Sequence, residues 1–150
     1  MCKISKKASC ILSEILTAVL FLLLLAGVFF LPAILRFFTD VFLKPAEYYT
    51  PTLIILYGAL IPAFAAVSAL HLLLKNVRDG RIFTPQSVSY LRILSWCAVG
   101  ESVLFFALGF YYCMVFLLSF AALFLGVILR VVKNVIEEAA AIKEENDFTV

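Results

Sequence analysis

One acidic side chain lies within an apolar segment, where its chemistry could matter most. Glu101 is the only charged residue between Ile93 and Leu129. A carboxyl group is costly inside a membrane, so it marks either a functional site or a specific contact between helices. Ser119 lies at a matching depth in the following apolar segment, and Ser102 is adjacent to Glu101. We expect Glu101 to hydrogen-bond Ser119, which would either clip two helices together or create a site that carries a proton.

Patterns typical of enzymes and metal sites are missing from the sequence. The only histidine is His71, and the four cysteines form no Cys-x-x-Cys pair. Neither a glycine-rich phosphate loop nor a Gly-x-Ser-x-Gly motif occurs. The net charge of +2 is too small for a nucleic-acid-binding surface. We therefore expect no enzyme activity, no cofactor, no metal ion and no direct nucleic-acid binding.

The composition indicates an integral membrane protein whose main partner is the lipid bilayer. Of the 150 residues, 65% are hydrophobic and 15% are charged, whereas a soluble domain has about 45–50% apolar and about 25% charged residues. A helix needs about 20 apolar residues to cross about 30 Å of hydrocarbon. We expect a single all-α domain over 1–150, a polytopic membrane protein with four transmembrane helices and an amphipathic cytoplasmic C-terminal extension.

Four apolar segments are long enough to be these helices. They lie at about residues 13–35, 50–74, 91–108 and 114–130. The last two come from one apolar run that is too long for a single span, so we expect a turn at Gly109–Cys113 with its tyrosines at the membrane interface. The second segment has small residues spaced four apart, which favours close helix packing in lipid. We expect this second helix to be the packing centre.

The distribution of basic residues predicts the orientation. Ten Lys and Arg residues lie at the N-terminus, in the second loop and in the C-terminal tail, whereas two, Arg36 and Lys44, lie in the first loop. Basic residues favour the cytoplasmic side of a membrane. We expect a multi-pass membrane protein with both termini in the cytoplasm.

Two cytoplasmic segments are candidates for binding a partner: a corner at 75–91 and a tail at 131–150. In the corner, Gly80 can end one helix, and Thr84 followed by Pro85 can begin the next. Arg78 and Arg81 either anchor the corner at lipid headgroups or take part in docking.

The tail is predicted to be an amphipathic helix with an apolar stripe and acidic residues on its other faces. The stripe is Val135, Ile136, Ala139 and Ile142. Because an acidic helix is poorly suited to an anionic membrane surface, the stripe is expected to need a protein surface. That surface is the chain's own corner, another copy of the chain or a soluble partner. In a docking surface, we expect Arg78 or Arg81 to lie near the acidic tail residues.

Three stretches of the sequence resemble a bacterial YoaS-like membrane family. They are LKNVRDGRIFTPQSVSYLR at 74–92, the ILSWC that follows it, and the tail ILRVVKNVIEEAAAIKEENDFTV at 128–150. The resemblance implies a four-helix, multi-pass protein of the bacterial cytoplasmic (inner) membrane, of unknown function and often encoded beside a small Cro/CI-type helix-turn-helix regulator. It implies no catalytic or ligand-binding residue.

Two functions follow from these observations. The first is a non-catalytic membrane regulator, or docking partner, for a small cytoplasmic protein such as a DNA-binding regulator. The second is a small proton-coupled transporter or exporter that uses Glu101. Polar residues are too sparse within the four spans to line a path in one copy, so the transporter would act as a homo-oligomer, most simply a dimer.

Overall fold

The computed structural model describes residues 2–43 and 45–148, and their side chains from residue 11 to residue 145. Within these residues the chain forms four long α-helices and a short 3-10 helix, η1. They are α1 (Cys2–Val41), η1 (Ala46–Tyr48), α2 (Tyr49–Arg78), α3 (Pro85–Gly109) and α4 (Val115–Phe148). Lys44 of the predicted external loop and the last two residues of the predicted tail lie outside the described residues. The expected all-α fold is confirmed.

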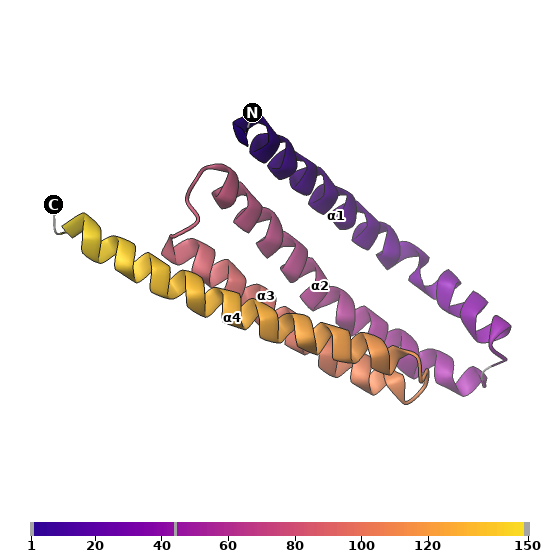
Figure 1. Cartoon of the computed structure of the whole chain (residues 1–150). Coiled ribbons are helices and arrows are strands. Elements are labelled where there is room, and N and C mark those ends of the chain that lie inside the picture. Colours follow the sequence, from indigo (N-terminus) through magenta and orange to yellow (C-terminus); the bar gives the residue numbers. More distant parts are fainter. Residues whose placement is uncertain (1, 44, 149–150) are drawn as a thin grey trace.

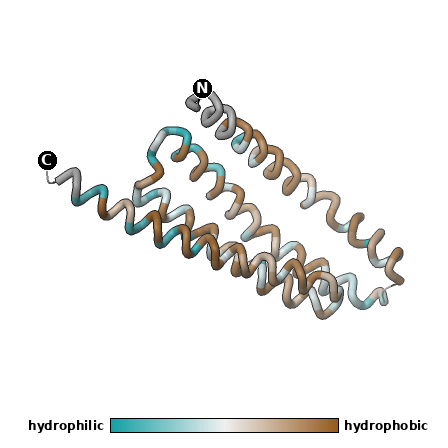
Figure 2. Tube along the Cα trace, viewed as in Figure 1, coloured by the Kyte–Doolittle hydropathy of each residue, from teal (hydrophilic) through white to brown (hydrophobic). Residues whose placement is uncertain are grey.

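Each of the four helices is long and apolar enough to cross a membrane. Apolar residues colour most of each helix in Figure 2, and polar residues gather at the corner between α2 and α3. Two helices are much longer than their predicted spans: α1 has 40 residues and α4 has 34. At 1.5 Å per residue, a 34-residue helix is about 50 Å long, well over the roughly 30 Å of hydrocarbon. The helix α4 therefore extends beyond the membrane.

The helices pack mainly in chain order, α1 on α2, α2 on α3 and α3 on α4. Figure 1 shows α1 lying along α2 at one side of the molecule, while α3 and α4 cross closely at the other. Both chain ends lie at the same end of the molecule, opposite the α1–α2 connection and the α3–α4 turn. The arrangement is an open row of helices, which leaves long apolar faces of α1 and α4 for lipid.

The most enclosed helix is α3, which corrects the expectation that the second span would be the packing centre. The helix α2 buries Thr52, Ala59 and Ala69, whereas α3 buries eight residues: Ser87, Val88, Leu91, Leu94, Ser95, Ser102, Leu108 and Gly109. The reason is that α3 carries small residues on the side that meets α4, and these allow the two helices to come close.

The contact between α3 and α4 is closest at three levels along the hairpin. At its turn, a Cβ atom on Gly109 would lie 2.6 Å from the Phe116 ring, so only glycine fits there. Farther along, the Ser119 hydroxyl donates a hydrogen bond to the Ser102 carbonyl oxygen at 2.8 Å. Near the other end, the Ser95 hydroxyl donates to the carbonyl oxygen of Gly126 at 2.9 Å. The predicted turn after Gly109 is confirmed.

Candidate functional site

The corner between α2 and α3 has the local structure that its sequence predicts. Gly80 has a φ of +74°, a conformation that favours glycine and ends α2. Thr84 is the extended residue before α3, and its hydroxyl accepts a hydrogen bond from the Ser87 backbone N–H at 3.4 Å. Pro85 takes the first helical position, where its missing N–H costs no hydrogen bond.

A buried serine holds this corner together. The side chain of Ser87 is fully buried, and its hydroxyl donates a hydrogen bond to the Arg81 carbonyl oxygen at 3.0 Å. The Asn76 amide donates to the same hydroxyl from α2 at 3.3 Å. The Thr84 hydroxyl also donates to the Arg81 carbonyl oxygen, at 3.1 Å. The corner is therefore a defined turn that fixes where α3 begins relative to α2.

The ion pairs around the corner and the tail differ from those expected. The Arg78 guanidinium pairs with Glu14 of α1 at 2.8 Å, and within the described residues Arg81 makes no ion pair with the tail. The basic residue that meets the tail is Arg92, whose guanidinium lies 3.6 Å from the Glu137 carboxylate. The prediction for Arg78 or Arg81 was therefore wrong. The cause is the order of packing, since the end of α2 lies beside α1 while α4 packs on α3.

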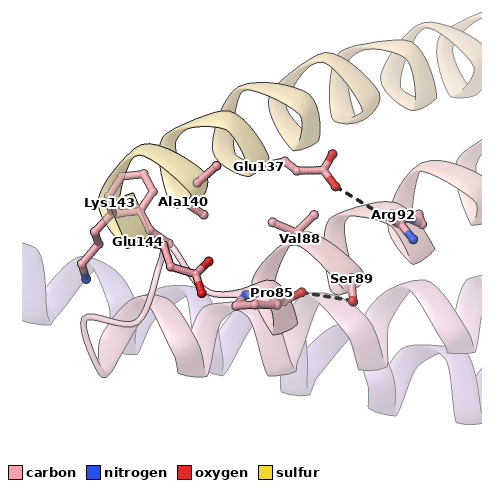
Figure 3. A pocket seen from close by; sticks show the side chains of 10 residues that line it. Pro85, Val88, Ser89, Arg92, Glu137, Ala140, Lys143 and Glu144 are labelled. Atoms are coloured by element: carbon pink, nitrogen blue, oxygen red, sulfur yellow. Dashed lines mark hydrogen bonds and ion pairs between the residues drawn. The ribbon is translucent and has the colours of Figure 1, made fainter. Parts of the chain in front are cut away.

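The first turns of α3 and the extension of α4 enclose a groove of about 630 Å³. Figure 3 shows Glu137 of α4 pointing toward Arg92 of α3 across this groove. The residues that line it are Phe83, Pro85, Val88, Ser89, Arg92, Glu137, Ala140, Ala141, Lys143 and Glu144. The hydrogen bond from Lys133, at 2.6 Å, together with the charges of Lys133 and Arg92, lowers the pKa of the Glu137 carboxyl. This carboxylate therefore stays charged at neutral pH, and its ion pair with Arg92 spans the groove between α3 and α4.

Two residues of the apolar stripe, Val135 and Ile142, point away from the groove. Val135 is 61% exposed and Ile142 is 56% exposed, while Ile136 and Ala139 are partly covered. Successive residues of an α-helix are turned by about 100°, so Val135 and Ile142 lie on roughly the opposite side of α4 from Ala140. The expectation that the stripe would be incompletely buried in a single copy is confirmed. The outward direction of Val135 and Ile142 was not expected.

The intramembrane carboxyl group does not make the predicted hydrogen bond. Ser119 bonds to Ser102 instead, with its hydroxyl donating to the Ser102 carbonyl oxygen and lying 3.5 Å from the Ser102 hydroxyl. The Oε2 atom of Glu101 is buried and has no hydrogen-bond partner among the described residues, although the residue as a whole is partly exposed. A one-residue step turns Glu101 about 100° away from the face of α3 that meets α4.

Other reactive groups are scattered. In the described part of the chain, no three His, Cys, Asp or Glu residues lie close enough to hold a metal ion. Cys97 and Cys113 are free thiols, on α3 and in the turn after it. The structure thus has two separate candidate sites: a face made of the groove and the stripe at the end of the molecule that holds the chain ends, and a carboxyl group within the membrane-spanning part.

The sequence analysis missed Arg92 and the groove residues of α4. In the sequence, Arg92 is one of several basic residues that indicate the orientation of the chain in the membrane. Its pairing with Glu137 depends on the length of the α3–α4 turn and on the rotation of both helices. A signal was present in the i, i+4 spacing of Lys133 and Glu137, which favours an ion pair on one face of a helix.

A comparison with known families shows to which family the chain belongs. A family model described as "Protein of unknown function (DUF2975)" matches residues 41–150. The chain belongs to this family. It is also similar to the "Uncharacterized membrane protein YoaS" of Bacillus subtilis (strain 168), with 28% identity over 137 residues that cover 82% of this chain and 85% of the relative. The predicted YoaS-like membrane family is confirmed. No solved structure matches the chain.

The family match covers α2, α3 and α4, together with the corner and the tail, and it leaves out almost all of α1. The family is described as one of unknown function and the relative as an uncharacterised membrane protein, and neither description indicates a catalytic family. The part of the chain that matches the family model is therefore the part that builds the groove and the stripe.

Proposed function

We propose that this protein is a non-catalytic protein of the bacterial inner membrane that docks a small soluble protein on its cytoplasmic face. The observation that carries the proposal is the outward direction of two residues of the apolar stripe on α4, Val135 and Ile142, which are more than half exposed. This stripe lies beyond Arg130, past the end of the apolar span. An apolar helix face outside the hydrocarbon favours a protein surface that covers it.

The orientation with both termini in the cytoplasm is part of this proposal. Both ends of the described chain lie at the same end of the molecule, and ten of the twelve Lys and Arg residues lie in segments at that end. The positive-inside rule favours the cytoplasm for that end. The stripe, the groove and the corner then all face the cytoplasm.

The stripe also favours a particular kind of partner. Glu138 follows Val135 by three residues, and Glu145 follows Ile142 by three, so acidic groups border the apolar surface along one side. The complementary partner has an apolar patch with a basic rim. A small DNA-binding regulator has basic surface of this kind, because it must neutralise phosphates. The helix-turn-helix proteins implied by the family resemblance are therefore the first partners to test.

Photocrosslinking in living cells tests the proposal. A photoreactive amino acid at Val135 is expected to capture one small soluble protein. The control position is Val103, which is 64% exposed on the membrane-spanning part of α3 and is expected to label lipid. Capture from Val135 should disappear with Ile142→Ser, because this change removes half of the apolar contact. Labelling of lipid or of a second copy alone from Val135 would contradict the docking proposal.

A second candidate function is proton-coupled transport, and one observation favours it. The Oε2 atom of Glu101 is buried without a hydrogen-bond partner in the described part of the chain. Such a group is free to exchange a proton with a substrate or with a second copy of the chain. In this case Glu101→Gln abolishes proton-driven efflux from reconstituted vesicles, while Ser119→Ala leaves it intact. Unchanged efflux in Glu101→Gln would exclude this second function.

A further inference from the structure

A second groove, of about 590 Å³, lies between α1 and α2. Each helix contributes four residues to its lining: Thr17, Ala18, Phe21 and Leu22 from α1, and Val67, Ser68, His71 and Leu72 from α2. The groove opens to the outside of the helix row, where Leu22 is 64% exposed and Leu72 is 42% exposed. Its position within the two spans means that lipid is its natural surrounding.

The polar groups in this groove leave one side chain available. The Thr17 hydroxyl donates a hydrogen bond to the Glu14 carbonyl oxygen at 2.9 Å, and the Ser68 hydroxyl donates to the Phe64 carbonyl oxygen at 2.8 Å. Both hydroxyls thus form their hydrogen bonds within their own helices. The imidazole of His71 has no such bond among the described residues, and it is exposed. It is the group that can donate a hydrogen bond into the groove.

The two ends of the groove differ in chemistry. At the membrane end, Phe21 and Phe64 pack edge to face with their ring centroids 5.5 Å apart. At the other end, the Glu14–Arg78 ion pair joins α1 to α2. Lys75 lies between His71 and Arg78, and it is exposed.

The spacing of His71, Lys75 and Arg78 places all three on one face of α2. A row of hydrogen-bond donors and positive charges therefore leads from the apolar groove to the membrane surface. This order of groups matches a phospholipid, whose acyl chains lie in the hydrocarbon and whose phosphate lies at the interface. A second copy of the chain fits poorly, because a symmetric contact would bring the same positive row against itself.

We propose that the groove between α1 and α2 binds one anionic phospholipid from the leaflet next to the chain termini. One acyl chain lies in the groove beside Phe21 and Leu72. The phosphate lies at the level of His71 and Lys75 and reaches Arg78. This lipid site is independent of the protein-docking surface on α4, which lies on the opposite side of the helix row.

Photoactivatable lipids in nanodiscs test the site. We expect phosphatidylglycerol with a reactive group in its acyl chain to label the peptides around 17–22 and 67–72. Phosphatidylcholine with the same acyl chain is expected to label them roughly fivefold less for each basic side chain engaged. Equal labelling by the two lipids would overturn the proposal.

Two tryptophan variants separate the groove from the general lipid surface. Ala18→Trp fills the groove and should abolish the selective labelling. Val19→Trp adds the same bulk one residue away, at a position that is 45% exposed and does not line the groove, and it should leave the labelling unchanged. Selective labelling that survives Ala18→Trp, or crosslinks between two copies at this face, would overturn the proposal.

Charge variants test the headgroup contact even if the Ala18→Trp variant does not insert into the membrane. Lys75→Gln should lower the selectivity for phosphatidylglycerol roughly fivefold. Glu14→Gln should raise the selectivity, because it releases the Arg78 guanidinium from its ion pair. A site that served only to hold α1 against α2 would respond to neither change in this direction. No change in selectivity in both variants would count against the lipid site.

Discussion

A glycine on α4 lies in close contact with α3, and replacing it should separate the C-terminal extension of α4 from α3. A Cβ atom on Gly126 would lie 3.1 Å from a methyl group of Val99 and 3.4 Å from the Ser95 carbonyl oxygen. The two methyl groups of valine would extend farther than this Cβ atom. We therefore expect Gly126→Val to push α4 away from α3.

The size of the effect follows from two contributions. Extra bulk in a packed contact costs about 1–3 kcal/mol. Loss of the hydrogen bond from the Ser95 hydroxyl to the Gly126 carbonyl oxygen adds about 0.6 kcal/mol, the mean for such bonds within membranes. The free energy of unfolding should therefore fall by about 2–4 kcal/mol. The change should also break the Arg92–Glu137 ion pair, because the two helices no longer keep their register.

Unfolding in mixed detergent micelles measures this change, with Trp96 as the fluorescent probe. The guanidinium of Arg130 on α4 lies 5.1 Å from the centre of the Trp96 ring on α3, so the probe reports separation of these helices. The matched control is Gly27→Val, since no atom lies within 4 Å of a Cβ at Gly27. The reasoning is refuted if Gly126→Val is no more destabilising than Gly27→Val.

Three further predictions concern orientation, the intramembrane carboxyl group and pH. Reporter fusions after Val150 and at Lys44 should read cytoplasmic and external respectively, and a cytoplasmic reading at Lys44 would reverse the proposed topology. Glu101→Gln should preserve the free energy of unfolding, and Glu101→Leu should keep or raise it, because Oε2 has no hydrogen-bond partner to lose. A large loss of stability in the leucine variant would contradict this prediction, since it would reveal a contact that the carboxyl group makes. Since the pKa of Glu137 is lowered on folding, its contribution to stability is present at neutral pH and disappears as the pH falls through the lowered value. Titration of the Glu137 side chain by NMR should therefore show a pKa below the ordinary glutamate value, and Lys133→Gln should raise this pKa, because the hydrogen bond from Lys133 is its main cause; an unshifted pKa would contradict the ion pairs of Glu137.

Local features could be predicted from the sequence because their causes are local. The turn after Gly109 follows from the length of the apolar run, which is too long for a single membrane-spanning helix. The ends of α2 and α3 at the corner follow from the conformations that Gly80, Thr84 and Pro85 favour. The exposed stripe on α4 follows from helical periodicity alone. Each of these features depends on residues that are close together in the sequence.

Features that depend on the rotation or order of helices could not be predicted in this way. Glu101 and Ser119 were correctly placed at similar depths, but depth does not fix the direction of a side chain around the helix axis. Ser102, one residue later, faces α4 and takes the hydrogen bond from Ser119. Similarly, the choice between Arg78 and Arg92 as the neighbour of the tail depends on α4 packing against α3 and not against α2. The single sequence carries no direct signal for that choice.

The most direct test of the docking proposal is a truncation. A chain ending at Ile136 keeps all four spans and the corner, but it lacks Ile142 and the acidic residues beside the stripe. Crosslinking from Val135 is expected to capture a soluble protein in the full-length chain and to lose it in the truncated chain, while membrane insertion and the α3–α4 contact remain. Capture of the same protein by an inserted truncated chain would contradict the account and leave the tail as a simple extension of α4.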